Sequence, residues 1–211
     1  MTDTHVMPPA DREALHGAAR DLHTRFRGVF GEETIAALLL ASYRDLAATA
    51  TVHRWLAIGA ERFAAQRLAA LAHAEHLCEG ATPAVLFMCA HNAARSQMAL
   101  GWFTSLARGR AVGWSVGSEP AYQIDPASAA VMAEVGIDIT GEFAKPWAIE
   151  FLRAADVVVT MGCGDACPLV TGKRYEDWEM PDPRDRPLAE VRLIRDQIRD
   201  QVGRLLASLG I

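Results

Sequence analysis

The chain is predicted to fold as an α/β domain with a four-stranded, parallel, doubly wound sheet, preceded by an all-α bundle of three helices. Three observations predict this class. Residues 11–77 carry apolar side chains at helical spacing, with no alternating strand pattern. From residue 84 onward, short apolar runs alternate with helical stretches, as in right-handed strand–helix–strand units. A Gly-Ala-Thr-Pro segment at 80–83 separates the two regions, so we place the domains at 1–80 and 81–211.

The first region is expected to hold three amphipathic helices. Pro8 and Pro9 precede the first helix, and Gly28 and Gly31 separate it from the second. The apolar stripes of the second and third helices consist of Ile35, Leu38, Leu39, Ala41 and Leu46, and of Leu56, Ala60, Phe63, Ala64, Leu68 and Leu71. A bundle of about 70 residues has a small core. We therefore expect it to stabilise the chain or to form a homodimer through these helices.

The elements of the second region follow one another along the chain. Strands are expected at 84–88, 111–116, 155–161 and 173–178, and helices at 96–106, 126–135, 145–152 and from 187 to the end. The first strand is wholly apolar, as in a parallel sheet covered on both faces. Asp125-Pro126 predicts a capped helix start, and Lys145-Pro146 is expected to open a short helix. The five tryptophans are expected in the core, and the functional site at the carboxyl ends of the strands.

Composition excludes several classes of function. The 211 residues are 51% hydrophobic and carry a net charge of −5, which gives no general attraction to nucleic acid or anionic membranes. No run of about 18 apolar residues predicts a transmembrane helix. The first residues lack the basic and apolar regions of a signal peptide, so we expect a cytoplasmic protein. In that compartment, four cysteines indicate catalytic, redox or metal chemistry rather than structural disulfides.

The sequence around Cys89 predicts an oxyanion site. Cys89 ends the first expected strand, five small or polar residues follow, and Arg95-Ser96 opens a helix. Loop N–H groups and a helix N-terminus attract negative charge, and the same field favours the Cys89 thiolate. Arg95 can bind two oxygens through its planar fork, and Ser96 can donate a hydrogen bond to the thiolate. The expected oxyanion-binding residues are Ala90, His91, Asn92, Ala93, Ala94, Arg95 and Ser96.

The stretch from Cys89 to Ala99, Cys-x5-Arg-Ser-Gln-Met-Ala, resembles the phosphate loop of the low-molecular-weight phosphotyrosine phosphatase superfamily, closest to its arsenate reductase branch. The resemblance covers residues 84–209 and implies the phosphotyrosine phosphatase I-like sheet. Similar helical extensions precede some actinobacterial arsenate reductases. Asn92 matches a position that orders the loop by hydrogen bonding. Ala94 stands where Gly or Cys is frequent; if that position requires a positive φ, alanine costs about 1 kcal/mol.

The resemblance also implies roles for residues outside the loop. Asp182, in an Asp-Pro pair before the last helix, matches the general acid that protonates the leaving oxygen, an effect of roughly 10²–10⁴-fold. Cys163 and Cys167, after the third strand, match a three-thiol relay. In it, Cys89 attacks arsenate, Cys163 attacks the Cys89 sulfur and Cys167 attacks Cys163. Electrons would come from thioredoxin, or from a low-molecular-weight thiol with a glutaredoxin-like partner, and no bound cofactor is expected.

Alternatives remain open at this point. A phosphotyrosine phosphatase would use the same loop, but such enzymes often place aromatic residues after Asp-Pro, where this chain has Arg184-Asp185. That difference favours a small inorganic oxyanion. No metal is expected at the Cys-x3-Cys pair, at the His73, His76 and Cys78 group, or as potassium beside Leu100. A non-enzymatic sensor is a third reading. DNA binding is not expected, because the charges of the first 80 residues are mixed in sign.

Overall fold

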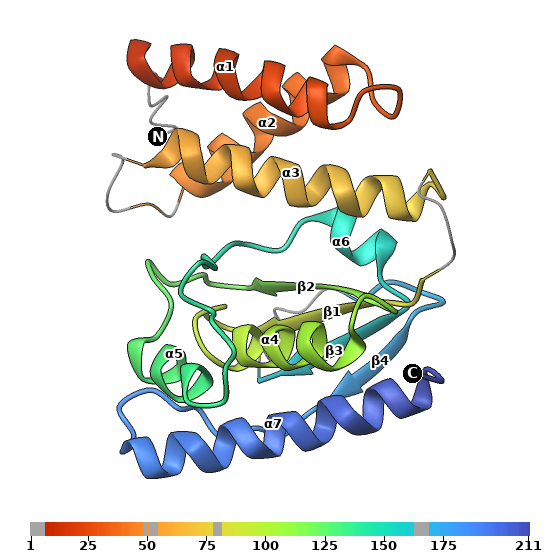
Figure 1. Ribbon diagram of the computed structural model, residues 1–211. Helices are drawn as coiled ribbons and strands as arrows, with labels where there is room; N and C mark the ends of the chain where they lie inside the picture. Colours follow the sequence, from red (N-terminus) through yellow and green to blue (C-terminus); the bar gives the residue numbers. More distant parts are fainter. Residues whose placement is uncertain (1–6, 49, 51–54, 78–81, 163–168) are drawn as a thin grey trace. The chain divides into compact units, whose positions relative to one another are not determined.

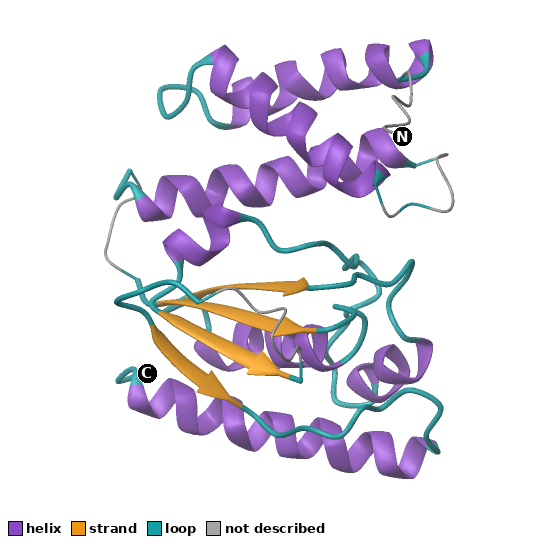
Figure 2. Ribbon diagram, turned by 180° about the vertical axis from the view of Figure 1, so that it is seen from behind, coloured by secondary structure: helices purple, strands orange, loops and turns teal. Residues whose placement is uncertain are grey.

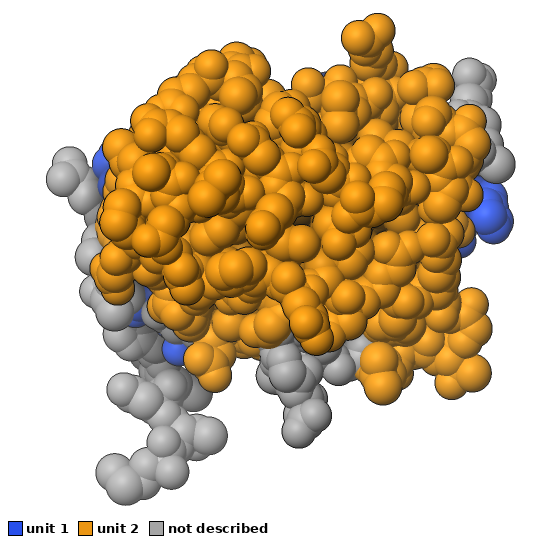
Figure 3. Space-filling view, turned by 90° about the horizontal axis from the view of Figure 1, so that it is seen from below, with its two compact units in different colours: residues 1–77 blue, residues 78–211 orange. Residues whose placement is uncertain are grey.

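The computed structural model describes residues 7–48, 50, 55–77, 82–162 and 169–211. The chain divides into two compact units, residues 1–77 and 78–211, which are coloured separately in Figure 3.

Unit 1 is a bundle of three helices, which confirms the predicted all-α region. They are α1 (Pro9–Arg25), α2 (Glu32–Ala47) and α3 (Leu56–Ala74), and each packs against the other two (Figure 1). The buried core consists mainly of Leu15, Leu22, Phe26, Ile35, Leu39, Ala60, Ala64 and Leu68. Polar contacts join α3 to α2 at the edge of this core, where Arg67 donates to the Asp45 carboxylate at 3.0 Å and to the buried Ser42 hydroxyl at 3.3 Å.

Unit 2 contains the predicted four-stranded sheet. Its strands are β1 (Ala84–Cys89), β2 (Val112–Gly117), β3 (Val157–Met161) and β4 (Arg174–Asp177). All pairings are parallel and the spatial order is β2-β1-β3-β4 (Figure 2). Every residue of β1 is buried, as its apolar sequence predicts. Because β1 is central, its last residue, Cys89, lies in the middle of the carboxyl edge of the sheet.

Helices cover both faces of this sheet (Figure 1). On one face lies α4 (Arg95–Ala107), which contacts β1, β2 and α7 (Leu188–Ser208). The helix α5 (Pro126–Ala133) packs beside α7, and its N-terminus is capped by the predicted Asp125, whose carboxylate accepts the Ser128 N–H at 2.8 Å. The short α6 (Ile149–Ala154) lies on the opposite face. This layering confirms the doubly wound α/β class.

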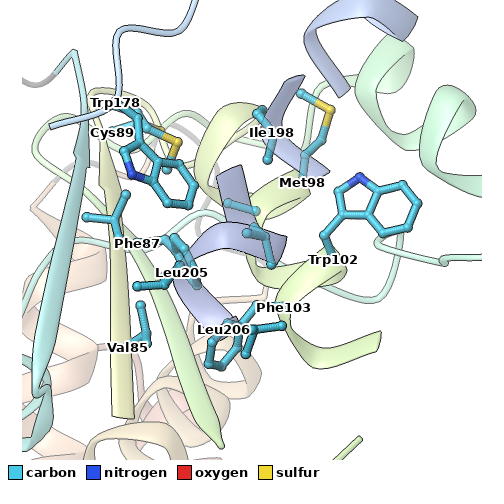
Figure 4. Close-up of a cluster of buried hydrophobic side chains, with 14 of the residues drawn as sticks. Val85, Phe87, Cys89, Met98, Trp102, Phe103, Trp178, Ile198, Leu205 and Leu206 are labelled. Carbon is cyan, nitrogen blue, oxygen red and sulfur yellow. The ribbon is translucent and has the colours of Figure 1, made fainter. Parts of the chain in front are cut away.

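The core under α4 and α7 anchors the strand that ends in Cys89. Val85, Phe87 and Cys89 alternate along β1 and face this layer (Figure 4). The centroid of the Phe87 ring lies 5.4 Å from that of Phe103 of α4 and 6.0 Å from that of Trp178, which follows β4. A side chain packed this closely has little freedom, so the strand end holds a fixed position.

Two sequence-based expectations are wrong. No helix starts at Lys145-Pro146: α6 begins at Ile149, because the preceding backbone extends beside β2. There, the Gly117 N–H donates to the Lys145 carbonyl, which a helix starting at this point would need, and the Trp147 N–H donates to the Gly117 carbonyl. The tryptophans are not all core residues, because Trp55 and Trp147 are 60% and 41% exposed. None of the helices in the described part of the chain is both long and apolar enough to cross a membrane.

Candidate active site

The loop between β1 and α4 turns its carbonyl groups toward the segment that follows β2. Carbonyls that accept backbone hydrogen bonds from residues 118–125, at 2.8 to 3.2 Å, are those of Cys89, Ala90, His91 and Ala93. A planar trans peptide holds its N–H opposite its C=O, so the next amides in each case point to the other side of the loop. The Asn92 N–H does so and donates to the Cys89 sulfur at 3.2 Å. Converging amides of this kind form an anion-binding concavity.

Cys89 lies at the bottom of this concavity. Its side chain is buried, and its sulfur is 3.0 Å from the Ser96 hydroxyl. The Asn92 side-chain amide donates to that hydroxyl oxygen at 2.8 Å, which leaves the hydroxyl proton free to point at the sulfur. A thiolate here therefore receives two hydrogen bonds, from Asn92 and Ser96, beside the positive N-terminus of α4.

Asn92 organises the loop from behind. Its side chain is fully buried, and the side-chain oxygen Oδ1 accepts hydrogen bonds from the Lys145 backbone N–H at 3.0 Å and from the Gln97 side-chain amide at 3.2 Å. Asn92 also has the positive φ of the loop, 46°, a conformation that asparagine tolerates better than most residues. Ala94 has a φ of −134°, so the condition under which alanine would be costly there is not met.

Arg95 lies over the loop with its guanidinium held on several sides. It is 8% exposed, and it contacts the Met180 carbonyl at 3.4 Å and the Asp182 carboxylate at 3.6 Å. Gly162, directly after β3, has a φ of 70°, and a β-carbon there would stand 2.7 Å from an Arg95 nitrogen. Gly117, at the end of β2, is similar, because a β-carbon would stand 2.7 Å from the Ala90 carbonyl oxygen.

These two glycines shape the site and were missed in the sequence analysis. Gly117 is the residue of β2 that pairs with Cys89, and Gly162 directly follows Met161, the residue of β3 that pairs with Cys89. Glycine at such a position signals close approach of another group. Gln97 and Lys145 also hold Asn92. Gln97 stands in the loop motif but was given no role there, and Lys145 was expected only to open a helix.

Asp182 faces Arg95 across the pocket and is held by Arg184. Arg184 donates to the two carboxylate oxygens of Asp182 from its backbone N–H at 3.1 Å and from its guanidinium at 2.8 and 3.0 Å. Burial alone would raise the pKa of Asp182, but these hydrogen bonds and the charges of Arg95 and Arg184 outweigh it and lower the pKa below its ordinary value. The pKa of Arg184 is raised by the same hydrogen bonds, against its partial burial.

The residues so far described enclose one small pocket. It is lined by Cys89, His91, Ala93, Ala94, Arg95, Asp182 and Arg184. Only about 10 Å³ is open to the centres of water-sized molecules, room for about one water. His91 lies at the rim, and its ring bonds the Glu119 carbonyl at 3.0 Å.

The structure thus brings Asp182 together with Cys89, Arg95 and Ser96, although it lies far from them in the sequence. Cys163 and Cys167, the expected relay, and Cys78 lie outside the described residues. Within the described ranges, no group of three His, Cys, Asp or Glu side chains is placed to hold a metal ion.

A parallel sheet of order β2-β1-β3-β4, with a Cys-x5-Arg oxyanion loop after its central strand, defines a phosphatase-like class of α/β proteins. Residues 84–210 match the model of the low molecular weight phosphotyrosine protein phosphatase family, and the chain belongs to this family. Residues 15–72 match a second model, the N-terminal domain of protein-tyrosine-phosphatase-like proteins.

Several of the similar proteins are named arsenate reductases. A thioredoxin-dependent arsenate reductase of Corynebacterium glutamicum has a solved structure that superimposes with a TM-score of 0.82 at 39% identity, over 94% of this chain and 97% of that one. The glutaredoxin arsenate reductase of Synechocystis is 38% identical over 131 residues, 60% of this chain and 98% of the relative. An arsenate reductase of Staphylococcus haemolyticus is 34% identical over 122 residues, 56% of this chain and 92% of the relative.

Proposed function

We propose that the protein is a cytoplasmic arsenate reductase that reduces arsenate to arsenite. The observation that carries this proposal is the convergence of the Cys89 sulfur, the loop amides, Arg95 and Asp182 on one small pocket, the set of groups that an attack on a tetrahedral oxyanion requires. The names of the relatives support arsenate as the substrate. Arg184, in place of an aromatic residue after Asp-Pro, also favours an inorganic oxyanion over an aryl phosphate.

In the first step, the Cys89 thiolate attacks arsenic and forms a sulfur–arsenic bond. Arg95 and the loop amides bind the arsenate oxygens and their developing charge. Asp182, once protonated, gives its proton to the leaving oxygen, which departs as water. The arsenic remains As(V) in this adduct, so no electron has yet been transferred to it.

In the second step, the Cys163 thiolate attacks the Cys89 sulfur. The sulfur–arsenic bond breaks and its electron pair stays on arsenic, which leaves as arsenite, As(III), while a Cys89–Cys163 disulfide forms. Cys167 then attacks Cys163, which moves the disulfide to Cys163–Cys167 and frees Cys89. The positions of these cysteines support the relay, because the segment begins directly after Gly162, which borders the Arg95 guanidinium.

Thioredoxin is the proposed electron donor, with a low-molecular-weight thiol and a glutaredoxin-like partner as the variant of this route. No resident cofactor takes part in either. The three helices of unit 1 are proposed to mediate a homodimer. Light scattering on the full chain tests that assignment, and a monomeric mass would contradict it.

The activity is tested with purified protein, arsenate, thioredoxin, its reductase and NADPH. Arsenite should form with the wild type and with Cys78→Ser, and fail to form with Cys89→Ser, Cys163→Ser or Cys167→Ser. With the low-molecular-weight thiol route, Cys163→Ser should retain turnover. Mass spectrometry should find a Cys163–Cys167 disulfide after one turnover. Hydrolysis of an aryl phosphate without any arsenite would identify a phosphatase instead.

A further inference from the structure

Arg184 has a place in the pocket that no step above uses. It follows Asp182-Pro183 and is stabilised in a turn where the next residue, Asp185, has a φ of 59°. Its side chain is 51% exposed, yet it lines the same small pocket as Cys89 and Arg95.

The Asp182 carboxylate lies between two guanidinium groups. The same oxygen, Oδ2, is 3.6 Å from Arg95 and 2.8 Å from Arg184. Two planar donor forks converging on one anion are the arrangement that binds phosphate-like groups. A carboxylate of the chain itself occupies the position between them, and room for only about one water remains.

We propose that Arg184 is an oxyanion ligand, that Asp182 holds it in place of the substrate, and that a small tetrahedral dianion draws Arg184 away from Asp182 as it enters. Arg184 then covers the outward oxygens of the anion, and Asp182 becomes free to carry a proton. The proposal deepens the proposed function, since it concerns the same site. It assigns the pocket to inorganic oxyanions and leaves little room for an aryl group at the position of Arg184.

The charges around Asp182 make this exchange favourable for acid catalysis. The carboxylate faces Arg95 from α4, Arg184 from its own loop and Cys89 from β1, while Arg186 donates to its backbone carbonyl at 2.6 Å and stays with the main chain. His91 lies at the rim of the same pocket. A bound dianion adds negative charge beside the carboxylate and removes one cation, and both changes raise the pKa of Asp182. Bound substrate thus favours the protonated form of Asp182, and the contact with Arg184 favours the ionised form.

Binding without turnover tests the ligand role. Sulfate, a tetrahedral dianion that does not titrate in the working range, is titrated calorimetrically into the reduced full chain. Arg184→Ala should weaken sulfate binding about tenfold, the effect of exchanging one charge-assisted contact. Arg184→Lys keeps the charge without the fork, and should lie between the two. Arg199→Ala, which removes an exposed arginine paired with Asp200 on α7, should bind as the wild type does.

Proton uptake tests the release of Asp182. Repeating the titrations in mildly acidic buffers of different ionisation enthalpy measures the protons taken up with sulfate. Wild type should take up more than Arg184→Ala, and Asp182→Asn should lose that part of the uptake. Equal sulfate affinity in wild type and Arg184→Ala overturns the ligand role. Equal proton uptake in the two overturns the release of Asp182.

Substrate choice provides a third readout. Arg184→Ala should raise the rate of aryl phosphate hydrolysis above that of the wild type, because the side chain above the pocket is gone; an unchanged or lower rate contradicts the assignment to inorganic oxyanions. Thermal melting of each variant verifies that the chain is folded. Failure to form arsenite would contradict the proposed function and leave the ligand role of Arg184 standing, since the sulfate measurements need no turnover.

Discussion

Replacing Asn92 by alanine should destabilise the protein through the loop that holds Cys89. The Asn92 side chain makes three buried hydrogen bonds, to Ser96 at 2.8 Å, from Lys145 at 3.0 Å and from Gln97 at 3.2 Å. Each buried hydrogen bond contributes about 1 kcal/mol net, and more where its loss leaves a buried donor unsatisfied. Their loss should lower the free energy of unfolding by about 3 kcal/mol.

The backbone of Asn92 adds a second, separable effect. At a φ of 46°, alanine is strained by about 1–2 kcal/mol, whereas glycine is not, although glycine gains roughly 0.4–1 kcal/mol of entropy in the unfolded chain. Asn92→Gly should therefore be about 0.5–1 kcal/mol more stable than Asn92→Ala and still well below the wild type. Urea unfolding of the three proteins measures both differences.

The isosteric Asn92→Asp variant separates packing from hydrogen bonding. The aspartate keeps two acceptors but cannot donate to Ser96, so the Ser96 hydroxyl turns its proton to the carboxylate and away from the Cys89 sulfur. Alkylation of Cys89 by iodoacetamide at neutral pH should slow, as read from the Cys89 peptide by mass spectrometry. If Asn92→Gly unfolds at the same urea concentration as the wild type, or below Asn92→Ala, the reasoning about this residue is refuted.

Three further predictions follow from contacts elsewhere in the chain. Gly162→Ala should weaken sulfate binding about tenfold or more through its clash with the arginine of the loop, whereas Gly172→Ala, with a φ of 84° and open space around it, should cost similar stability and leave binding intact; equal binding in the two contradicts the clash. Asp182→Asn should be less stable than wild type near neutral pH, and the gap should close as pH falls from about 3.8 through the lowered pKa of the folded state, since a lowered pKa stabilises the fold fully above the unfolded value and loses this effect below the folded one; a gap that persists in acid-unfolding curves refutes this. Burial and the 2.6 Å bond to Asp11 raise the pKa of Tyr43 to about 12, so wild type should lose stability relative to Tyr43→Phe as pH rises from 10 to 12, and parallel curves would show that the phenol does not titrate differently on folding.

Local patterns predicted the elements of this fold well where one physical cause dominates. The apolar run at 84–88 predicted a strand buried on both faces, and Asp125-Pro126 predicted a capped helix start; both are confirmed. The pattern at Lys145-Pro146 predicted a helix start wrongly, because pairing with Gly117 competes for the same backbone groups. Proline at a first helical position and proline in an extended segment have the same local signature, and only the neighbouring strand decides between them.

In the candidate site, too, local patterns predicted some residues, and others depend on contacts between distant segments. The Cys89 loop was predicted from the order of strand, nucleophile, arginine and hydroxyl, and Asp182 from the resemblance to a family. Gln97 stands in the loop motif but was given no role there. The hydrogen bond from the Lys145 N–H could not be predicted, since no local spacing places a residue 53 positions away on an asparagine oxygen.

The sequence by itself predicted a cysteine and an arginine on a loop suited to a tetrahedral oxyanion, at the end of a central parallel strand, because those properties follow from residue order along one strand–loop–helix unit. Only the tertiary structure decided what surrounds that thiolate. It placed the positive φ of the loop at Asn92 rather than at Ala94, used Gly162 to make room for Arg95, and set the Arg184 guanidinium on the Asp182 carboxylate in the pocket. Such contacts join segments distant in sequence, and their geometry depends on how the sheet aligns its strand ends.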